Sequence, residues 1–197
     1  MPSELQAAAI THFHDDSHGA PGWPAAGTRH ADGAWHWIET NHRYNCLLWA
    51  EEDLARRLNV GDTEIAANKR AIDGFNQKRN DAVEKIDEVI LSALAGVTPM
   101  ASARLSSETA GAMIDRMSIL SLKIRAMREQ THRSDVDAEH IETCRGKLAK
   151  LIEQRADLGN CLDRLLAEAA AGTMFYKIYR QFKMYNDPKL NPQLYNA

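Results

Sequence analysis

The chain has 197 residues, of which 44% are hydrophobic, and a formal net charge of -3. This length and apolar content allow one hydrophobic core and argue against a second domain, while the mild negative charge argues against a nucleic-acid-binding protein. The cysteines Cys46, Cys144 and Cys161 lie far apart in the sequence, so they predict neither a disulfide framework nor a zinc ligand set. We therefore expect reduced thiols.

The sequence carries no motif for membrane insertion or for a common cofactor. Its apolar runs are shorter than the roughly 18 residues that a membrane-spanning helix needs. The N-terminal residues MPSELQAAAITHFHDDSH lack the basic start and apolar stretch of a signal peptide. Glycine-rich nucleotide-binding motifs and the Gly-x-Ser-x-Gly elbow are absent from the sequence. These features predict a cytoplasmic protein without a bound cofactor and without membrane insertion.

Apolar residues recur with helical periodicity through the long middle of the chain. Glycine and proline, which interrupt helices, are concentrated in residues 19–33 and from residue 172 onward. The predicted helices, in chain order, span residues 3–13, 34–58, 62–95, 106–130 and 134–172. The expected N-terminal caps of the last three helices are Asp62, Ser106 or Ser107, and Ser134. No strand is predicted.

The predicted fold is an all-α, single-domain bundle of about five helices, with long central helices and an extended C-terminal tail. Residues 1–33 form an N-terminal helix and a Gly/Pro-rich loop, residues 34–172 form the bundle, and residues 173–197 form an aromatic and basic tail. The tail is predicted to be helical as far as Tyr185 and to pack on the bundle through its aromatic side chains. A contact with a partner protein or a membrane surface through its basic side chains is the alternative.

A stripe of polar residues on the second predicted helix faces the side where a core should lie. At 100° per residue, Asn41, Asn45, Glu52 and Arg56 fall within one narrow arc. Large hydrophobic side chains flank this arc on both sides, whereas Glu39 falls on the opposite, solvent side. The polar stripe is therefore predicted to lie inside the bundle.

Polar residues also occupy apolar faces on the other long helices. The stripe on the third helix, beside a row of isoleucines and other hydrophobic residues, consists of Lys69, Asp73, Asn76, Asn80 and Asp87. On the fourth and fifth helices, Asp115 and Arg155 lie among leucines, isoleucines and alanines. We expect neither Asp115 nor Arg155 to face the solvent.

Charged groups that are buried without partners are strongly destabilising, so these residues must pair, bind water or line a cavity. One interpretation is a closed structural network in which Glu52 or Asp115 pairs with Arg155. Another is a polar pocket that is open to a ligand. The third is a shifted helical register that leaves the stripes in solvent.

A pocket of this kind suits a sugar or a sugar phosphate. Amides and carboxylates bind hydroxyl groups, and the basic side chains of Arg56, Lys69, Lys123 and Arg155 suit a phosphate or a carboxylate. Catalysis would need a general acid or base, for which the candidates are Glu52, Asp73 and Asp115. No spacing singles out one of them, so the sequence leaves open whether the protein is an enzyme.

The histidines do not form a convincing metal motif. His12, His14 and His18 superficially resemble the metal-binding segment of metallo-β-lactamase-like hydrolases, but Ser17 stands where that motif needs a histidine. A ferritin-like di-iron bundle needs two Glu-x-x-His spacings, here Glu39 with His42 and Glu129 with His132, and inward glutamates on two further helices. Glu39 is predicted to face the solvent, and Glu129 lies at a helix end. We therefore predict solvated histidines and no metal.

Four segments resemble a bacterial family of uncharacterised proteins that carry a domain of unknown function. In chain order they are WIETNHRYNCLLWAEEDLARR, IAANKRAIDGFNQKRNDAVEKID, ETAGAMIDRMSILSLKI and YRQFKMYNDPKLNPQLY, and together they span Trp37 to Tyr195. The resemblance implies an all-helical fold and no established activity. It also implies a setting of cell-surface polysaccharide assembly, which favours a sugar ligand.

The motif residues of that family correspond to specific positions in this chain. They are Asn41, His42, Asn45, Trp49, Glu52, Asp53, Asp73, Asn76, Arg79, Asn80, Asp115, Arg116, Lys123 and residues 179–188. His42 enters the candidate site through this resemblance alone.

The first functional hypothesis is a protein that binds a small polar or anionic ligand, such as a sugar or sugar phosphate, within the bundle. Its candidate ligand-binding residues are Asn41, His42, Asn45, Glu52, Arg56, Asp73, Asn76, Asn80, Asp115, Lys123 and Arg155. The alternative is a non-catalytic interaction or scaffold protein whose polar stripes form a structural network. Its contacts with a partner, or with a second copy in a homo-oligomer, would use Trp35, Trp37 and Trp49.

Overall fold

The computed structural model describes residues 5–180, 184 and 187–195, and within them the chain is almost entirely helical. The elements are α1 (Ala7–Ser17), α2 (Gly33–Leu54), α3 (Asp62–Ala93), β1 (Arg104–Leu105), α4 (Ala110–Thr131), α5 (Ala138–Ala170), β2 (Met174–Phe175) and α6 (Pro192–Tyr195). The predicted all-α bundle with long central helices is therefore confirmed. The two short strands were not predicted.

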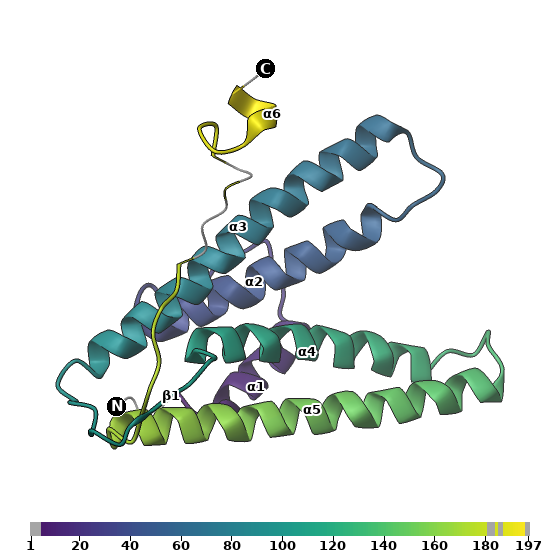
Figure 1. Cartoon of the computed structure of the whole chain (residues 1–197). Coiled ribbons are helices and arrows are strands. Elements are labelled where there is room, and N and C mark those ends of the chain that lie inside the picture. The colour runs from purple at the N-terminus through teal and green to yellow at the C-terminus, as the bar shows by residue number, and fades with distance from the viewer. Residues whose placement is uncertain (1–4, 181–183, 185–186, 196–197) are drawn as a thin grey trace.

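Two helical hairpins organise the molecule. α2 packs along α3 and α4 packs along α5, while α1 lies against α4 and α5. Figure 1 shows that the two hairpins lie close together at one end and diverge toward the other, where the α2–α3 and α4–α5 turns are far apart. The divergence leaves one end of the bundle open.

The hydrophobic core lies at the closed end, where four of the helices meet. Ile38, Ile86, Ile114 and Leu162, from α2, α3, α4 and α5, are all fully buried there. Burying each such side chain contributes about 1.5–3 kcal/mol, so this cluster holds the two hairpins together. Ile10 adds α1 to the same core.

A close crossing of α3 and α4 requires a glycine at position 111. A Cβ atom on Gly111 would lie 2.5 Å from the backbone oxygen of Val83 and 2.9 Å from Oδ2 of Asp87. The backbone N–H of Gly111 also donates to Oδ1 of Asp87 at 2.7 Å. Asp87 thus accepts a hydrogen bond from the first turn of α4, and its burial raises its pKa to about 6.

The helix starts differ from the predicted caps at three places. Thr109 caps α4 by accepting from the N–H of Ala112, and Asp137 caps α5 by accepting from the N–H of His140. Gly61, rather than Asp62, precedes α3 and offers no side-chain cap. Ser106 lies before the helix start: its backbone N–H donates to the carbonyl of Phe175, and its Oγ donates to the carbonyl of Glu108 at 2.8 Å.

The N-terminal helix also begins and ends later than predicted, at Ala7 and Ser17. Ala7, Ile10 and Phe13 are buried on its inner face. The predicted end at Phe13 was wrong because His14 and Ser17 continue the same buried face, where Oγ of Ser17 donates to the carbonyl of Phe13.

The tail after α5 is extended rather than helical over its described residues 174–180. Gly172 ends α5 with a positive φ of 71°, after which β2 pairs in parallel with β1. Tyr176 is buried, and Arg180 contacts Glu84 at 3.2 Å and Glu88 at 2.7 Å. The tail thus contacts α3. Four residues of the predicted tail helix lie outside the described residues, namely Gln181, Phe182, Lys183 and Tyr185.

Among the described residues, no helix combines the length and the apolar character that crossing a membrane would require.

Candidate functional site

A polar cleft of about 490 Å³ lies between α2, α3 and α4. Its lining residues, which define the polar cleft below, are Asn45, Leu48, Trp49, Glu52, Asp53, Arg56, Lys69, Ile72, Asp73, Asn76, Arg79, Ile119 and Leu122. They come from positions up to 77 residues apart in the sequence. The contacts of α2 with α3 and α4 bring them together, and the divergence of the hairpins leaves the cleft open to the surface.

The floor of the polar cleft is a buried hydrogen-bond network centred on Asp115. Asn41 and Asn45 each donate through Nδ2 to Oδ1 of Asp115, at 2.8 and 2.9 Å. Asn45 also donates to Oγ of Ser118 at 3.0 Å. Asn41 and Ser118 are fully buried, so α2 and α4 are joined here by satisfied polar groups. The network positions the Asn45 side chain where the cleft begins.

The walls of the polar cleft carry charged pairs within single helices. Arg56 contacts Glu52 at 2.7 Å on α2, and Lys69 contacts Asp73 at 2.7 Å on α3. Glu52 and Arg56 have 46% and 69% of their side chains exposed, so their predicted burial was wrong. The cause is the divergence of the hairpins, which moves this end of α2 away from α4.

Arg79 lies deeper than the other two bases of the cleft, with 24% of its side chain exposed. Its Nε atom is 4.0 Å from Oδ1 of Asp115, and its Nη2 donates to Oδ1 of Asn80 at 2.8 Å. The cleft thus holds three carboxylates and three bases in all: Glu52, Asp53, Asp73, Arg56, Lys69 and Arg79. Its lining has no formal net charge.

The structure brings most of the predicted ligand-binding residues together. Asn45, Glu52, Arg56, Asp73 and Asn76 line the polar cleft, and Asn41 and Asp115 lie beneath it. His42 adjoins the floor, with its Nδ1 atom 2.8 Å from Oγ of Ser118. Asn80 lines a smaller pocket near Asp87, although it also accepts from Arg79.

Two predicted residues lie elsewhere. Lys123 lines two grooves between α4 and α5 instead of the polar cleft. Arg155 contacts Asp15 at 2.6 Å, so it pairs with neither Glu52 nor Asp115 as the network interpretation required. The reason is that α5 packs mainly on α4 and α1, and none of its residues lines the polar cleft.

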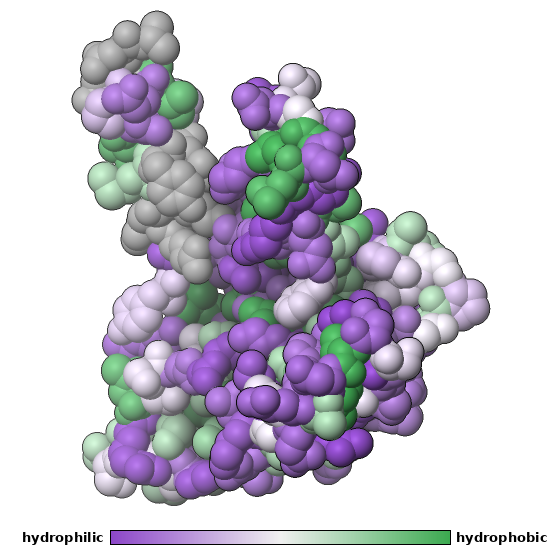
Figure 2. Space-filling view, turned by 90° about the vertical axis from the view of Figure 1, so that its right-hand side faces the viewer, coloured by the Kyte–Doolittle hydropathy of each residue, from purple (hydrophilic) through white to green (hydrophobic). Residues whose placement is uncertain are grey.

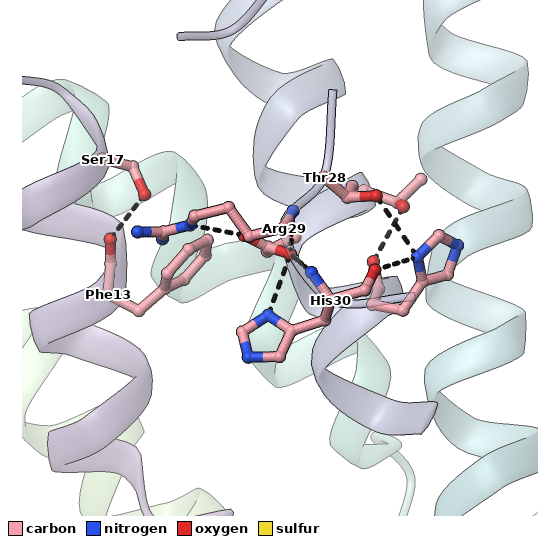
Figure 3. Close-up of polar contacts among 8 residues, drawn as sticks. Phe13, Ser17, Thr28, Arg29 and His30 are labelled. Atoms are coloured by element: carbon pink, nitrogen blue, oxygen red, sulfur yellow. Dashed lines mark hydrogen bonds and ion pairs between the residues drawn. The ribbon is translucent and has the colours of Figure 1, made fainter. Parts of the chain in front are cut away.

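Glu39 is fully buried, which overturns its predicted solvent-facing position. The loop before α2 folds over it, and the backbone N–H groups of Arg29 and His30 donate to Oε2 at 2.9 and 2.7 Å. The side chains of both residues also contact the carboxylate, and Figure 3 shows Arg29 extending beside the ring of Phe13. Burial raises the pKa of Glu39, but these hydrogen bonds outweigh it and hold the pKa below its usual value.

Comparison with known protein families matches residues 35–178 to the family described as "Protein of unknown function (DUF4254)". The chain belongs to this family. The match covers α2 to β2 and therefore all lining residues of the polar cleft, and it confirms the predicted resemblance to a domain of unknown function. No curated protein and no solved structure matches the chain.

A second polar cluster lies where the N-terminal segment meets the DUF4254 region. It consists of His14, His18, His42 and Cys46, of which the first two precede the family match. His14 is fully buried and its ring centroid is 4.5 Å from that of His42. The predicted solvated state is therefore wrong for His14, because the α1 face that carries it packs on the DUF4254 helices. We call these four residues the histidine–cysteine cluster.

An apolar groove of about 740 Å³ lies along α4 and α5 at the open end, and Trp49 of α2 also lines it. Its lining includes Trp49, Met127 and Leu151, with Lys123 and Lys147 beside them. Figure 2 looks toward this end and shows two lobes with a hollow between them and hydrophobic surface on both. Trp49 lines both this groove and the polar cleft of the DUF4254 region.

Proposed function

We propose that the polar cleft binds a small polyhydroxylated ligand, either a sugar or a sugar carrying a single phosphate. The observation that carries this proposal is the arrangement of a satisfied, buried amide–carboxylate floor beneath an open cleft. The cleft volume of about 490 Å³ lies within the range of roughly 300–1,000 Å³ that is typical of small-molecule sites.

The residues around the floor have the chemistry that a sugar needs. The amide of Asn76 offers a donor and an acceptor, while Oδ1 of Asn45 and the carboxylate of Asp53 accept from hydroxyl groups. Both N–H groups of Asn45 are already used in the floor network. Trp49 supplies a flat apolar surface against which the C–H face of a pyranose ring can pack. The setting of polysaccharide assembly that the family resemblance implies also favours a sugar.

The charge balance of the cleft restricts the ligand further. Three carboxylates offset three bases, so a polyanion would meet as much repulsion as attraction. Arg79 is the base with the longest ion-pair distance of the three, 4.0 Å against 2.7 Å for Arg56 and Lys69. A single phosphate would therefore bind at Arg79 with the least disruption of existing pairs.

Calorimetric titrations with glucose 1-phosphate and methyl glucoside test this proposal. We expect Arg79→Gln to weaken glucose 1-phosphate binding by about tenfold or more, since a hydrogen bond to a charged group contributes about 1.5–3 kcal/mol, and to leave methyl glucoside binding unchanged. Asn76→Ala should weaken both. The matched control is Arg70→Gln, because Arg70 is exposed on the same helix and does not line the cleft.

The proposal fails if neither probe binds at millimolar concentration, or if Arg70→Gln weakens binding as much as Arg79→Gln does. Whether the bound sugar is also converted is decided by product analysis. In that case Glu52 and Asp73 are the candidates for proton transfer, because both carboxylates reach the cleft surface. Asp115, which already accepts two amide hydrogen bonds, serves to position Asn41 and Asn45.

The scaffold interpretation is favoured by a separate observation, the apolar groove at the open end. Its hydrophobic lining would suit a second copy of the chain, with the floor network around Asp115 acting as a structural link. Sedimentation velocity distinguishes the two candidates. A concentration-dependent dimer that dissociates on Met127→Lys, together with no sugar binding, would favour the scaffold.

A further inference from the structure

The histidine–cysteine cluster brings three metal-binding atoms together outside the polar cleft. One side-chain donor atom from each of His18, His42 and Cys46 lies within 4.8 Å of the other two. Nε2 of His42 is 3.8 Å from Sγ of Cys46. In a tetrahedral zinc site, bond lengths of about 2.0 Å to nitrogen and 2.3 Å to sulfur place these atoms about 3.5 Å apart. The spacing thus needs little adjustment to accept such an ion.

Two buried serines on α4 orient the histidine rings. Oγ of Ser118 is 2.8 Å from Nδ1 of His42, which leaves Nε2 toward Cys46. Oγ of Ser121 donates to the carbonyl of Ser118 at 2.8 Å and lies 3.2 Å from Nε2 of His18. Because the Ser121 proton is used in this way, the serine accepts from Nε2 and leaves the lone pair of His18 on Nδ1. Oxygen partners of this kind hold histidines in the orientation that metal ligands need.

His14 supplies an independent indication of a missing ligand. It is fully buried, and within the described part of the chain neither of its ring nitrogens has a hydrogen-bond partner. An unsatisfied buried polar group is destabilising by about 1–3 kcal/mol, so a fold that keeps one calls for an explanation. Its ring lies against that of His42, at the edge of the three-residue set.

The protonation states of the cluster suit a metal ion. Burial lowers the pKa of His42 to about 3 and that of His18 to about 4, and it lowers the pKa of His14 as well. All three rings are therefore neutral at pH 7, as ligands must be. Burial raises the pKa of the Cys46 thiol to about 11, so this group is protonated until a metal displaces the proton.

We propose that His18, His42 and Cys46 bind one divalent ion of the Zn²⁺ class, with His14 at the fourth position. Nitrogen and sulfur donors select such an ion over Mg²⁺ or Ca²⁺. Binding forms one metal–sulfur and three metal–nitrogen bonds and releases one proton from the Cys46 thiol to solvent. The His14 ring must turn toward the other three ligands to complete the set.

The site is structural rather than catalytic. Trp23 stacks on the ring of His42, with centroids 5.6 Å apart and planes 22° apart, and its Nε1 donates to Sγ of Cys46 at 3.4 Å. This cover and the four protein ligands leave no open position for a substrate. The ion would join α1 to α2 and so attach the segment that precedes the family match to the floor of the polar cleft.

The chain contains its own matched control. His140 and Cys144 on α5 have the same four-residue spacing as His42 and Cys46, and their Nε2 and Sγ atoms are 3.5 Å apart. Within the described residues, no third donor joins this pair in a metal-binding group. A pair alone should not hold Zn²⁺ tightly, so Cys144→Ser should behave like the unmodified protein.

The test uses the full chain, stripped with a chelator and then titrated with Zn²⁺ or Co²⁺. We expect one equivalent of Zn²⁺ to survive gel filtration, and a Co²⁺ adduct with tetrahedral d–d bands and a sulfur-to-cobalt charge-transfer band. Cys46→Ser should lose the charge-transfer band and weaken metal binding by about 100-fold or more, whereas Cys144→Ser should keep both. Zn²⁺ should also raise the Tm of the wild type but not that of Cys46→Ser.

Circular dichroism checks that the variants fold. If Cys46→Ser does not fold, His18→Ala replaces it, and the expected result is weaker Zn²⁺ binding rather than loss of the charge-transfer band. The proposal is overturned if the protein, stripped and then titrated with Zn²⁺, retains none of the ion after gel filtration. It is also overturned if Cys144→Ser loses the charge-transfer band as Cys46→Ser does. His12 is exposed on α1, the helix that also carries His14, so His12→Ala should not change metal binding. No sugar is present in these titrations, so their result is independent of the ligand proposed for the polar cleft.

Discussion

Several buried polar residues in this protein are satisfied by partners outside their own helix. Asn41 and Asn45 bond to Asp115, 74 and 70 positions later, and Glu39 bonds to the loop that precedes its own helix. Helical spacing correctly placed both asparagines inside the molecule, because they share the α2 face that meets α4. It misplaced Glu39, because the pattern within a helix does not show which loop will fold over the opposite face.

Asp87 makes stability depend on pH in a direction opposite to that of an ordinary ion-paired carboxylate. Its pKa is raised to about 6 in the folded state from an ordinary value of 3.8, chiefly by burial. The folded state therefore holds this proton more tightly, and the associated stability is present below pH 3.8 and lost as the pH rises through 6. At 1.36 kcal/mol per pKa unit, the loss is about 2–3 kcal/mol.

The measurement is denaturant unfolding of the wild type and Asp87→Asn between pH 3.5 and about pH 7, because the variant cannot titrate there. We expect the free energy of unfolding of the wild type, relative to the variant, to fall as the pH rises over this interval. Asp81→Asn, on the exposed side of α3, should show no such trend. A constant or rising difference for Asp87→Asn would contradict the assignment.

At the scale of elements, Gly111 decides how closely α3 and α4 approach. We expect Gly111→Ala to destabilise the protein by about 1–3 kcal/mol, the usual effect of overpacking, because the new Cβ would lie 2.5 Å from a backbone oxygen of α3. Thermal or denaturant unfolding measures the change.

Gly146→Ala on α5 is the matched control for this crossing. A Cβ at position 146 would meet no atom within 4 Å, so the substitution should stabilise the helix by about 0.5–1 kcal/mol. If Gly111→Ala stabilised the protein to the same extent as Gly146→Ala, the close crossing would not exist in solution.

The helices themselves were largely predictable from the sequence, but their ends were not. Long runs with helical periodicity and little glycine or proline mark α2 to α5, and the predicted ends of α3 fall within two residues of the observed ones. The start of α4 was placed several residues too early, because Ser106 is a good cap in isolation but joins the tail through a strand hydrogen bond. Ser106 and Phe175 are 69 positions apart, so their contact cannot be predicted from the local sequence pattern.

At the scale of the whole molecule, the tail is part of the folded structure as far as Arg180. We expect deletion of residues 173–197 to lower the free energy of unfolding by about 3 kcal/mol or more, because the deletion removes the buried ring of Tyr176 and leaves a cavity in the core. Deletion of residues 187–197 alone should leave stability unchanged, since Leu190 and Leu194 are exposed. Equal Tm values for the two deletions and the full chain would show that the tail does not contribute to the fold.

The sequence by itself determined the helical class, the single core and the polar faces of α2 and α3, because these depend on the spacing of side chains along one helix. Only the tertiary structure decided that the hairpins diverge, which opens the polar cleft at Glu52 and Arg56. It also decided that Arg155 pairs with Asp15 rather than with Glu52 or Asp115. It also gathered His14, His18, His42 and Cys46, which no sequence motif unites. The physical reason is that packing between helices depends on which faces meet, and this choice is made by the whole core at once.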